Sequence, residues 1–411
     1  MSRRRDGRSA PRQELRVFFR AGRGMQIVPV QSMETTTARV LVADDQADVL
    51  EALRWLLVGE GYEAELVAST DLVMERVQVG AFDLLLMDLN YTRDTTSGRE
   101  GLDLILRVRA VDPLIPIVVM TGWGSIDTAV DAMRRGASSF VQKPWDDSTL
   151  RDIVEREIGA GRAARRQDRK QQRELDEARL IQRALLPAAL PQVHGLRLAA
   201  VWQPMDGVGG DCFDVTVSGS AVGVMIADVA GKGMPAALLM SNLQAAVRAF
   251  AQDGAAPCAL ATSVNRLLCR HMVSGRFVTF CFARIDAAHG CVAYVNAGHN
   301  PPLVIRAGGA VERLTEGGTV LGVFPDATFV QAQIGVSPGD RLLFYTDGIS
   351  EARNTDGEEF GEQRIAAAAI AGRTLSAEDL KARVAAEVQA FTGGAFDDDA
   401  TIIVAALVQE D

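Results

Sequence analysis

The sequence predicts a two-domain chain in which an α/β domain with a parallel sheet precedes an α+β domain of layered antiparallel sheets flanked by helices. Its 411 residues are enough for two domains and their connections. Between Arg39 and residue 158, short Val/Ile/Leu-rich runs alternate with amphipathic stretches, which is typical of a parallel sheet covered on both faces. After residue 187, strand-like runs predominate and are separated by turns, which favours antiparallel sheets.

Five apolar runs in the first half predict strands, and the stretches between them have helical periodicity. The predicted strands are RVLVA, EAELVA, FDLLLM, PIVVM and SSFVQ. Right-handed crossovers place the carboxyl ends of all these strands along one edge of the sheet. A last helix, STLRDIVEREI, closes this domain, which we assign to residues 39–158.

The two flanking segments are predicted to lie outside the domains. Residues 1–38 are rich in Arg and then polar, which indicates a disordered tail, or an over-extended start with Met25 or Met33 as the first residue, rather than a nucleic-acid-binding arm. Gly159 and Gly161 are expected to interrupt the helix, so that residues 159–186 form a separate linker helix. Residues 187–411 then form the second domain.

Composition excludes several functional classes. The net charge of −10 argues against a nucleic-acid-binding protein, and no apolar run reaches the length of a membrane helix. The five cysteines contain no Cys-x-x-Cys pair, which indicates free thiols in a reducing cytoplasm. We therefore expect a cytoplasmic protein that binds neither nucleic acid nor membrane.

The first cluster of candidate functional residues follows the strands of the parallel sheet. Asp44 and Asp45 follow the first strand, Asp88 the third, Thr121 the fourth and Lys143 the fifth. Carboxylates gathered at this edge require a divalent cation, and oxygen ligands select Mg²⁺ or Mn²⁺. Asp88 is the best placed nucleophile for a phosphoryl group, with Lys143 and Thr121 positioned to bind its oxygens.

Residues 39–158 resemble the receiver domain of bacterial response regulators, which has a flavodoxin-like fold with a five-stranded parallel sheet. The resemblance rests on the acidic pair, Asp88, Thr121 and the Lys143-Pro144 step. It implies that a sensor histidine kinase phosphorylates Asp88 and that Phe140 changes rotamer together with Thr121. It also implies a Mg²⁺ ion held by Asp45, Asp88, the backbone carbonyl of Asn90 and Asp44. The loop NYTRDTTSGREG after Asp88 is longer and more polar than is usual for this family.

The second cluster consists of four aspartates at the ends of apolar runs, with glycines around them: Asp211, Asp228, Asp347 and Asp398. Glycine allows the backbone to approach a metal or a phosphate closely. Four carboxylates without His or Cys suit two hard cations, which can activate one water for attack on a phosphate ester.

This half resembles the SpoIIE-type branch of the PPM metal-dependent serine/threonine phosphatases. The resemblance rests on six motifs in order: ARLIQRALLP, VGGDCFD, IADVAGKGMPAAL, NAGHNPP, YTDGISEARN and DDDATIIV. It implies two Mn²⁺ or Mg²⁺ ions bridged by Asp228, with the carbonyl of Val229 as a further ligand. Asp347 and Asp398 would hold one metal, and Asp211 would orient metal-bound water or bind a third metal.

Three assignments stay open at this stage. Asp398 is favoured over Asp399 as a ligand because it lies three residues before Thr401. His299 invites a general-acid role, although bracing of the NAGHNPP loop is the preferred interpretation. Lys232 either contacts the substrate phosphate or is a solvated residue at a helix start. No phosphate-binding Arg is evident near the start of this domain.

Three functional hypotheses follow. The leading one is a response regulator in which phosphorylation of Asp88 controls a phosphoserine/phosphothreonine phosphatase. The resemblance implies that its substrate is a phosphorylated anti-sigma-factor antagonist with a STAS fold, in a partner-switching pathway, and that the chain forms a homodimer. The alternatives are a catalytically weak scaffold whose receiver state gates protein binding, and a transcription factor using the basic helix, which lacks a helix-turn-helix.

Overall fold

The computed structural model describes residues 37–91, 98–122, 126–205, 207–251, 254–272, 275–394, 396 and 398–409. Residues 1–36 of the predicted tail and residues 92–97 of the long polar loop after Asp88 therefore lie outside the described residues. The chain divides into two compact units between Arg169 and Lys170. Each unit is described by itself below.

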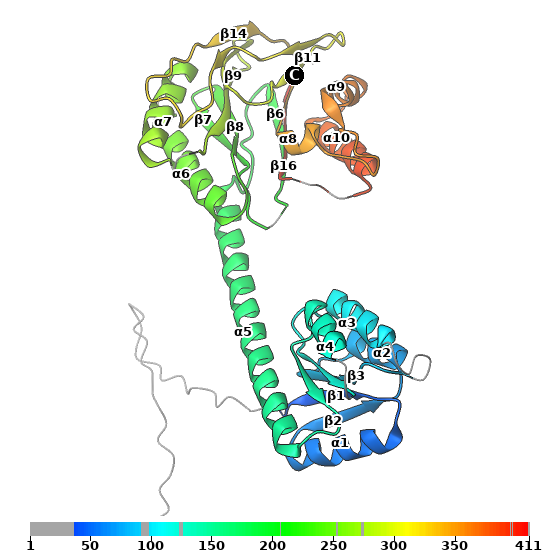
Figure 1. Ribbon diagram of the computed structural model, residues 1–411. Coiled ribbons are helices and arrows are strands. Elements are labelled where there is room, and N and C mark those ends of the chain that lie inside the picture. The colour runs from blue at the N-terminus through cyan, green and yellow to red at the C-terminus, as the bar shows by residue number, and fades with distance from the viewer. Residues whose placement is uncertain are drawn as a thin grey trace, which may run out of the picture. The chain divides into compact units, whose positions relative to one another are not determined.

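The first unit is the predicted α/β domain, with a parallel sheet in the order β2-β1-β3-β4-β5 (Figure 1). Its strands are β1 (Arg39–Ala43), β2 (Glu63–Val67), β3 (Leu84–Asp88), β4 (Ile117–Thr121) and β5 (Ser139–Gln142). Its helices are α1 (Ala47–Gly59), α2 (Thr70–Val79), α3 (Arg99–Val111), α4 (Ile126–Arg134) and the first part of α5 (Asp147–Leu185). Separate buried clusters cover the two faces of the sheet, as the continuous apolar strands require. The predicted fold class is confirmed.

Helix α5 corrects one expectation, because it runs without a break through Gly159 and Gly161. Gly161 is a packing position: a Cβ built there would lie 2.4 Å from Cγ of Pro116. The side chain of Arg162, one residue later, forms two hydrogen bonds with Asp83, at 2.8 and 3.1 Å. Close packing and these bonds offset the roughly 1 kcal/mol that a glycine costs within a helix.

The second unit contains two sheets whose strand pairs are mostly antiparallel, as predicted. One sheet has the order β13-β10-β9-β8-β7, with β14 also paired to β10, and the other has the order β12-β11-β15-β16-β6. The strands of the first sheet are β7 (Cys212–Ser218), β8 (Ala221–Val229), β9 (Val278–Asp286), β10 (Cys291–Ala297), β13 (Gly317–Gly318) and β14 (Ala332–Gly335). Those of the second are β6 (Leu196–Gln203), β11 (Leu303–Ile305), β12 (Val311–Arg313), β15 (Arg341–Tyr345) and β16 (Ala400–Leu407).

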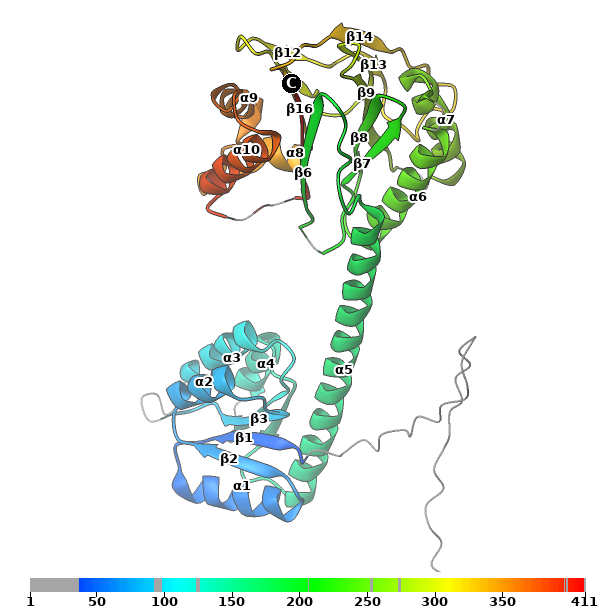
Figure 2. The same ribbon diagram turned by 180° about the vertical axis from the view of Figure 1, so that it is seen from behind.

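Helices lie on the outer faces of the two sheets in this unit (Figure 2). They are α6 (Met234–Phe250) and α7 (Pro257–His271) on one side, and α8 (Asp347–Ser350), α9 (Gly361–Ala371) and α10 (Ala377–Thr392) on the other. The period of two along β15 divides its side chains between cores: Leu342 and Phe344 join the core with the first sheet, whereas Leu343 and Tyr345 pack with α9 and α10. Within the described ranges, none of the helices has the length and apolar character required to cross a membrane.

Candidate functional sites

The first candidate site lies at the carboxyl edge of the parallel sheet. Asp44 and Asp45 follow β1, and Asp88 ends the neighbouring strand β3. Their nearest ligand atoms all lie within 4.8 Å of one another, and Asp44 and Asp88 are buried. Among the residues that the structure describes, no other three His, Cys, Asp or Glu side chains meet this spacing. The predicted convergence of these three carboxylates is therefore present.

Lys143, which follows β5, neutralises part of this acidic cluster. Its Nζ lies 2.7 Å from Oδ2 of Asp44 and 3.0 Å from Oδ2 of Asp88. Burial raises the pKa of Asp88, and Lys143 only partly offsets this effect. The Asp88 carboxylate is therefore shielded from solvent, and the ammonium of Lys143 lies close enough to bind a group that Asp88 accepts.

Of the remaining residues predicted for this site, Thr121 and Asn90 lie at the same edge, whereas Phe140 lies two residues further back, paired with Val119. Thr121 ends β4, the strand next to β3, and is buried. Asn90 follows Asp88 by two residues, and Phe140 on β5 is 48% exposed. An exposed Phe140 has room for the rotamer change that the sequence resemblance implies.

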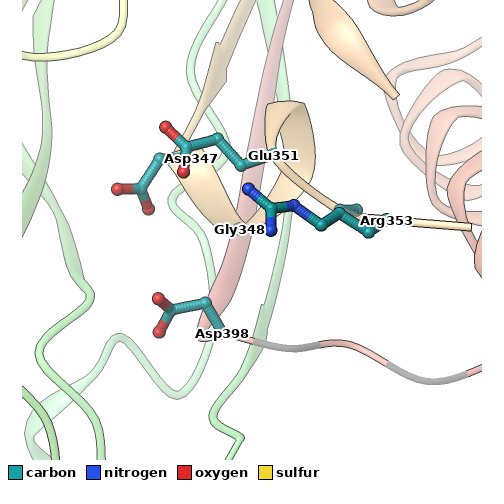
Figure 3. A pocket seen from close by; sticks show the side chains of 6 residues that line it. Asp347, Gly348, Glu351, Arg353 and Asp398 are labelled. Carbon is teal, nitrogen blue, oxygen red and sulfur yellow. The ribbon is translucent and has the colours of Figure 1, made fainter. Parts of the chain in front are cut away.

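The second candidate site draws its carboxylates from both sheets of the second unit. Asp211 precedes β7 and Asp228 lies near the end of β8, whereas Asp347 follows β15 and Asp398 and Asp399 precede β16. Residues distant in sequence therefore meet where the two sheets face each other. Figure 3 shows Asp347 and Asp398 with their carboxylates beside one cleft.

Asp211 is the most deeply buried of these acids, at 1% exposure. Its Oδ2 accepts hydrogen bonds from the hydroxyls of Thr346, at 2.7 Å, and Thr401, at 2.6 Å. Its Oδ1 is buried and has no hydrogen-bond partner among the described residues. Burial and then the charge of Asp228 raise the pKa of Asp211 well above its usual value. A buried oxygen of this kind is chemically suited to a cation or to metal-bound water.

Asp228 lies in the most acidic surroundings. Burial, followed by the charges of Asp347, Asp398 and Asp399, raises its pKa to about 7. Next to it, a Cβ on Gly210 would lie 2.6 Å from the carbonyl oxygen of Val229, so only glycine allows this approach. Carboxylates that repel one another across a partly buried site, together with a backbone carbonyl, are an oxygen donor set that fits hard divalent cations.

The geometry supports Asp398 over Asp399 as the metal ligand. Asp399 accepts hydrogen bonds from the N–H groups of Met205, at 2.9 Å, and Gly210, at 2.8 Å, so both of its oxygens are engaged by backbone. Asp398 instead lines a cleft of about 120 Å³ together with Asp347. Asp399 thus positions the loop that leads to Asp211.

His299 and Lys232 differ in their surroundings. His299 is buried, with its Nδ1 2.8 Å from Oγ1 of Thr279, and Asn296 bonds both its N–H and its carbonyl. Burial lowers the pKa of His299 to about 4, which favours a neutral bracing residue over a general acid. Nζ of Lys232 lies 3.3 Å from Oδ2 of Asp398, at the exposed rim of the site.

Three supporting residues were not anticipated from the sequence. Thr346 and Thr401 hold Asp211, and Gln182 of α5 exchanges two hydrogen bonds with Gly209. Thr346 lies in the YTDG motif directly before Asp347, and Thr401 lies in the DDDAT motif three residues after Asp398, so these motifs carried a signal for both. For Gln182, the only signal in the sequence was its position in the ARLIQRALLP motif.

Two family models match the chain. Residues 40–155 match the response regulator receiver domain, and residues 218–408 match stage II sporulation protein E (SpoIIE).

Two curated relatives match about half of the chain. Protein IcfG of Synechocystis sp. is 30% identical over 220 residues, which cover 47% of this chain and 35% of that protein. Phosphoserine phosphatase RsbU of Bacillus subtilis is 28% identical over 185 residues, which cover 45% of this chain and 55% of that protein. The chain thus spans about a third to about half the length of these relatives.

Among solved structures, the SiaA-PP2C domain of Pseudomonas aeruginosa superposes with a TM-score of 0.52 at 24% identity. The match covers 59% of this chain and 98% of that domain. This likeness identifies the fold of the second unit as PP2C-type.

Proposed function

Because the chain belongs to the response regulators that join a receiver domain to a SpoIIE-type PPM phosphatase domain, we propose that phosphorylation of Asp88 controls a metal-dependent protein phosphatase. Its substrates are phosphoserine and phosphothreonine side chains. We assign residues 39–158 to the receiver, 159–186 to a linker and 187–411 to the phosphatase. The observation that carries the proposal is the set of acids that both sheets of the second unit bring to one site.

In the phosphatase, Asp228, Asp347, Asp398 and the carbonyl of Val229 would hold two Mn²⁺ or Mg²⁺ ions. Such ions lower the pKa of a bound water and orient it for in-line attack on a phosphate ester. Asp211 would orient a water on these ions or bind a third metal: the hydroxyls of Thr346 and Thr401 fix one of its oxygens, and the other is buried without a hydrogen-bond partner among the described residues.

In the receiver, Asp44, Asp45, Asp88 and the carbonyl of Asn90 would hold Mg²⁺. Asp88 accepts the phosphoryl group, and Lys143, now bonded to both Asp44 and Asp88, would exchange one of these contacts for a phosphoryl oxygen. The bond shift would change the surroundings of Thr121, at the same sheet edge, and through it those of Phe140 on β5. This is the local event that we propose as the switch.

The partners follow from the two domains. A sensor histidine kinase supplies the phosphoryl group, and the substrate is a phosphorylated anti-sigma-factor antagonist of the STAS class. The relative RsbU is a phosphoserine phosphatase, which supports this class of substrate side chain. We further propose that the protein is cytoplasmic, acts as a homodimer, and binds neither nucleic acid nor membrane.

The test is hydrolysis of p-nitrophenyl phosphate with Mn²⁺, with and without beryllofluoride, which mimics the phosphoryl group on an aspartate. We expect turnover that requires Mn²⁺ and changes with beryllofluoride, and Asp88→Asn should abolish only the response to beryllofluoride. Turnover that ignores beryllofluoride would separate the enzyme from its switch. No turnover, also with a phosphoprotein substrate, would favour the scaffold alternative.

A further inference from the structure

The cleft beside the candidate metal centre contains an arginine that the proposed function leaves without a role. The cleft is lined by Asp347, Gly348, Glu351, Ala352, Arg353 and Asp398. Figure 3 shows the guanidinium of Arg353 directed into the space between the carboxylates of Asp347 and Asp398. Arg353 is therefore a cation that lines the same cleft as two of the proposed metal ligands.

The backbone that carries Arg353 is fixed by a tight hairpin. Arg353 forms a β-bridge with Glu359, and the carbonyl of Ala352 accepts a hydrogen bond from the N–H of Phe360 at 2.8 Å. At the tip, Oδ1 of Asn354 accepts from the N–H groups of Asp356, at 3.0 Å, and Glu358, at 2.9 Å. These contacts fix the backbone at Arg353 beside the cleft before any ligand arrives, so that only the side chain has to be ordered on binding.

The guanidinium itself is available to a ligand. It bonds Glu359 at 2.9 Å, but both side chains are about half exposed, at 56% and 50%. An ion pair exposed in this way contributes little and exchanges readily for a stronger partner. A phosphate dianion is such a partner, because the planar guanidinium donates two parallel hydrogen bonds to its oxygens.

The charge of the cleft explains why a cation is needed there. Glu351 also lines the cleft and would repel a phosphate even when metal ions compensate Asp347 and Asp398, and Lys232 is already placed against Asp398. The substrate of the proposed phosphatase must nevertheless bring its phosphate group to this cleft. We propose that Arg353 binds the phosphate of the substrate directly, in a bidentate geometry. It would thus serve as the phosphate-binding arginine that is not evident near the start of the domain. This inference rests on the proposed function.

The test compares four proteins, at saturating Mn²⁺ for KM and Ki and in a separate Mn²⁺ titration: wild type, Arg353→Gln, Arg353→Lys and Glu359→Gln. The readouts are KM for p-nitrophenyl phosphate, Ki for inorganic phosphate, and the Mn²⁺ concentration that gives half-maximal activity. Arg353→Gln should raise both KM and Ki about tenfold, since a charge-assisted bond to phosphate is lost. It should leave the Mn²⁺ requirement unchanged. Arg353→Lys should recover only part of the loss, because lysine cannot bind in a bidentate manner.

Glu359→Gln is the matched control, because it breaks the same ion pair while Arg353 stays. It should leave Ki unchanged or lower it. An unchanged Ki in Arg353→Gln, or an equal loss in Glu359→Gln, would overturn the proposal. Calorimetric titration of inorganic phosphate into the Mg²⁺-loaded proteins measures the same difference without turnover. If wild type proves inactive, the phosphatase proposal fails separately, while tenfold weaker phosphate binding by Arg353→Gln would still support the site.

Discussion

Gln182 and Gly209 exchange two hydrogen bonds: Nε2 of Gln182 donates to the carbonyl of Gly209 at 2.6 Å, and Oε1 accepts from its N–H at 3.0 Å. Gln182 is 3% exposed and lies in the last turn of α5, and Gly209 lies two residues before Asp211. The amide of Gln182 thereby satisfies both backbone polar groups of Gly209, in the loop that leads to Asp211. A helix end and a loop of the candidate phosphatase site are thus fixed to each other.

The first prediction concerns this pair. Gln182→Leu leaves the buried N–H and carbonyl of Gly209 unpaired, which costs about 1–3 kcal/mol for each group. We expect a lower Tm and a several-fold higher Mn²⁺ concentration for half-maximal hydrolysis, because the loop that carries Asp211 loses its support. Thermal unfolding and Mn²⁺ titration of activity measure the two effects.

Gln172→Leu serves as the control, since Gln172 is an exposed residue of the same helix. It should change neither quantity appreciably. Equal Mn²⁺ dependence in Gln182→Leu and wild type would show that the pair contributes to stability alone.

The second prediction concerns charge repulsion at Asp228. This carboxylate is partly buried and faces Asp347, Asp398 and Asp399. Replacement by Asn removes that repulsion, so Asp228→Asn should have a Tm equal to or above that of wild type in EDTA at pH 8. With Mn²⁺ the order should reverse, because the variant lacks one of the proposed metal ligands, and hydrolysis should fall by at least about a hundredfold.

Thermal unfolding with EDTA and with Mn²⁺ decides this prediction. A variant that Mn²⁺ stabilises as much as wild type would contradict the assignment of Asp228 as a ligand. A lower Tm in EDTA would instead indicate that the Asp228 carboxylate stabilises the loop.

The third prediction is a pH dependence at His299. Burial lowers the pKa of this imidazole in the folded protein from its usual 6.5 to about 4. The unfolded chain therefore binds a proton that the folded protein does not, so the contribution of neutral His299 is full above pH 6.5. It is lost as the pH falls from 6.5 towards 4.

We expect the Tm advantage of wild type over His299→Asn to be largest near pH 7.5 and to shrink towards pH 5. Paired thermal melts of the two proteins across this range make the measurement. A difference in Tm that does not vary with pH would show that folding leaves the pKa of His299 unchanged.

The fourth prediction concerns Arg248, which joins helix α6 to the end of α5. Its Nη2 donates to the carbonyl of Leu185 at 3.0 Å and to Oδ1 of Asp214 at 3.1 Å, and the Asp214 side chain is 1% exposed. Arg248→Met leaves that carboxylate buried without its partner, which typically costs about 3–5 kcal/mol. A large fall in Tm is expected.

The double variant Arg248→Met/Asp214→Asn should recover part of the lost stability, because no buried charge is then left unpaired. If the double variant is as unstable as Arg248→Met, the lost bond to Leu185 rather than the buried charge accounts for the effect.

The receiver shows how much local pattern alone can predict. Strands that are buried on both faces must be apolar throughout, so β1, β3 and β4 are visible as continuous runs, and right-handed crossovers bring their ends to one edge. The convergence of Asp44, Asp45 and Asp88 follows from that topology without further information.

Gly161 shows where such reasoning failed. Propensity predicts that a glycine weakens a helix, and the interruption expected at Gly159 and Gly161 was wrong. The reason is visible only in three dimensions, where Gly161 lies against Pro116 and any side chain would collide with that ring.

Local patterns in the sequence are enough to identify which residues could carry the chemistry, because hard cations bind oxygen ligands and carboxylates at strand ends beside glycines are visible as short motifs. Tertiary structure alone decided how they are used. The carboxylate of Asp399 accepts hydrogen bonds from the N–H groups of Met205 and Gly210, so that Asp398 rather than Asp399 lines the cleft. Gln182 bonds Gly209, which is 27 positions away in the sequence. Contacts of this kind depend on how separate elements pack, and no spacing along the chain encodes them.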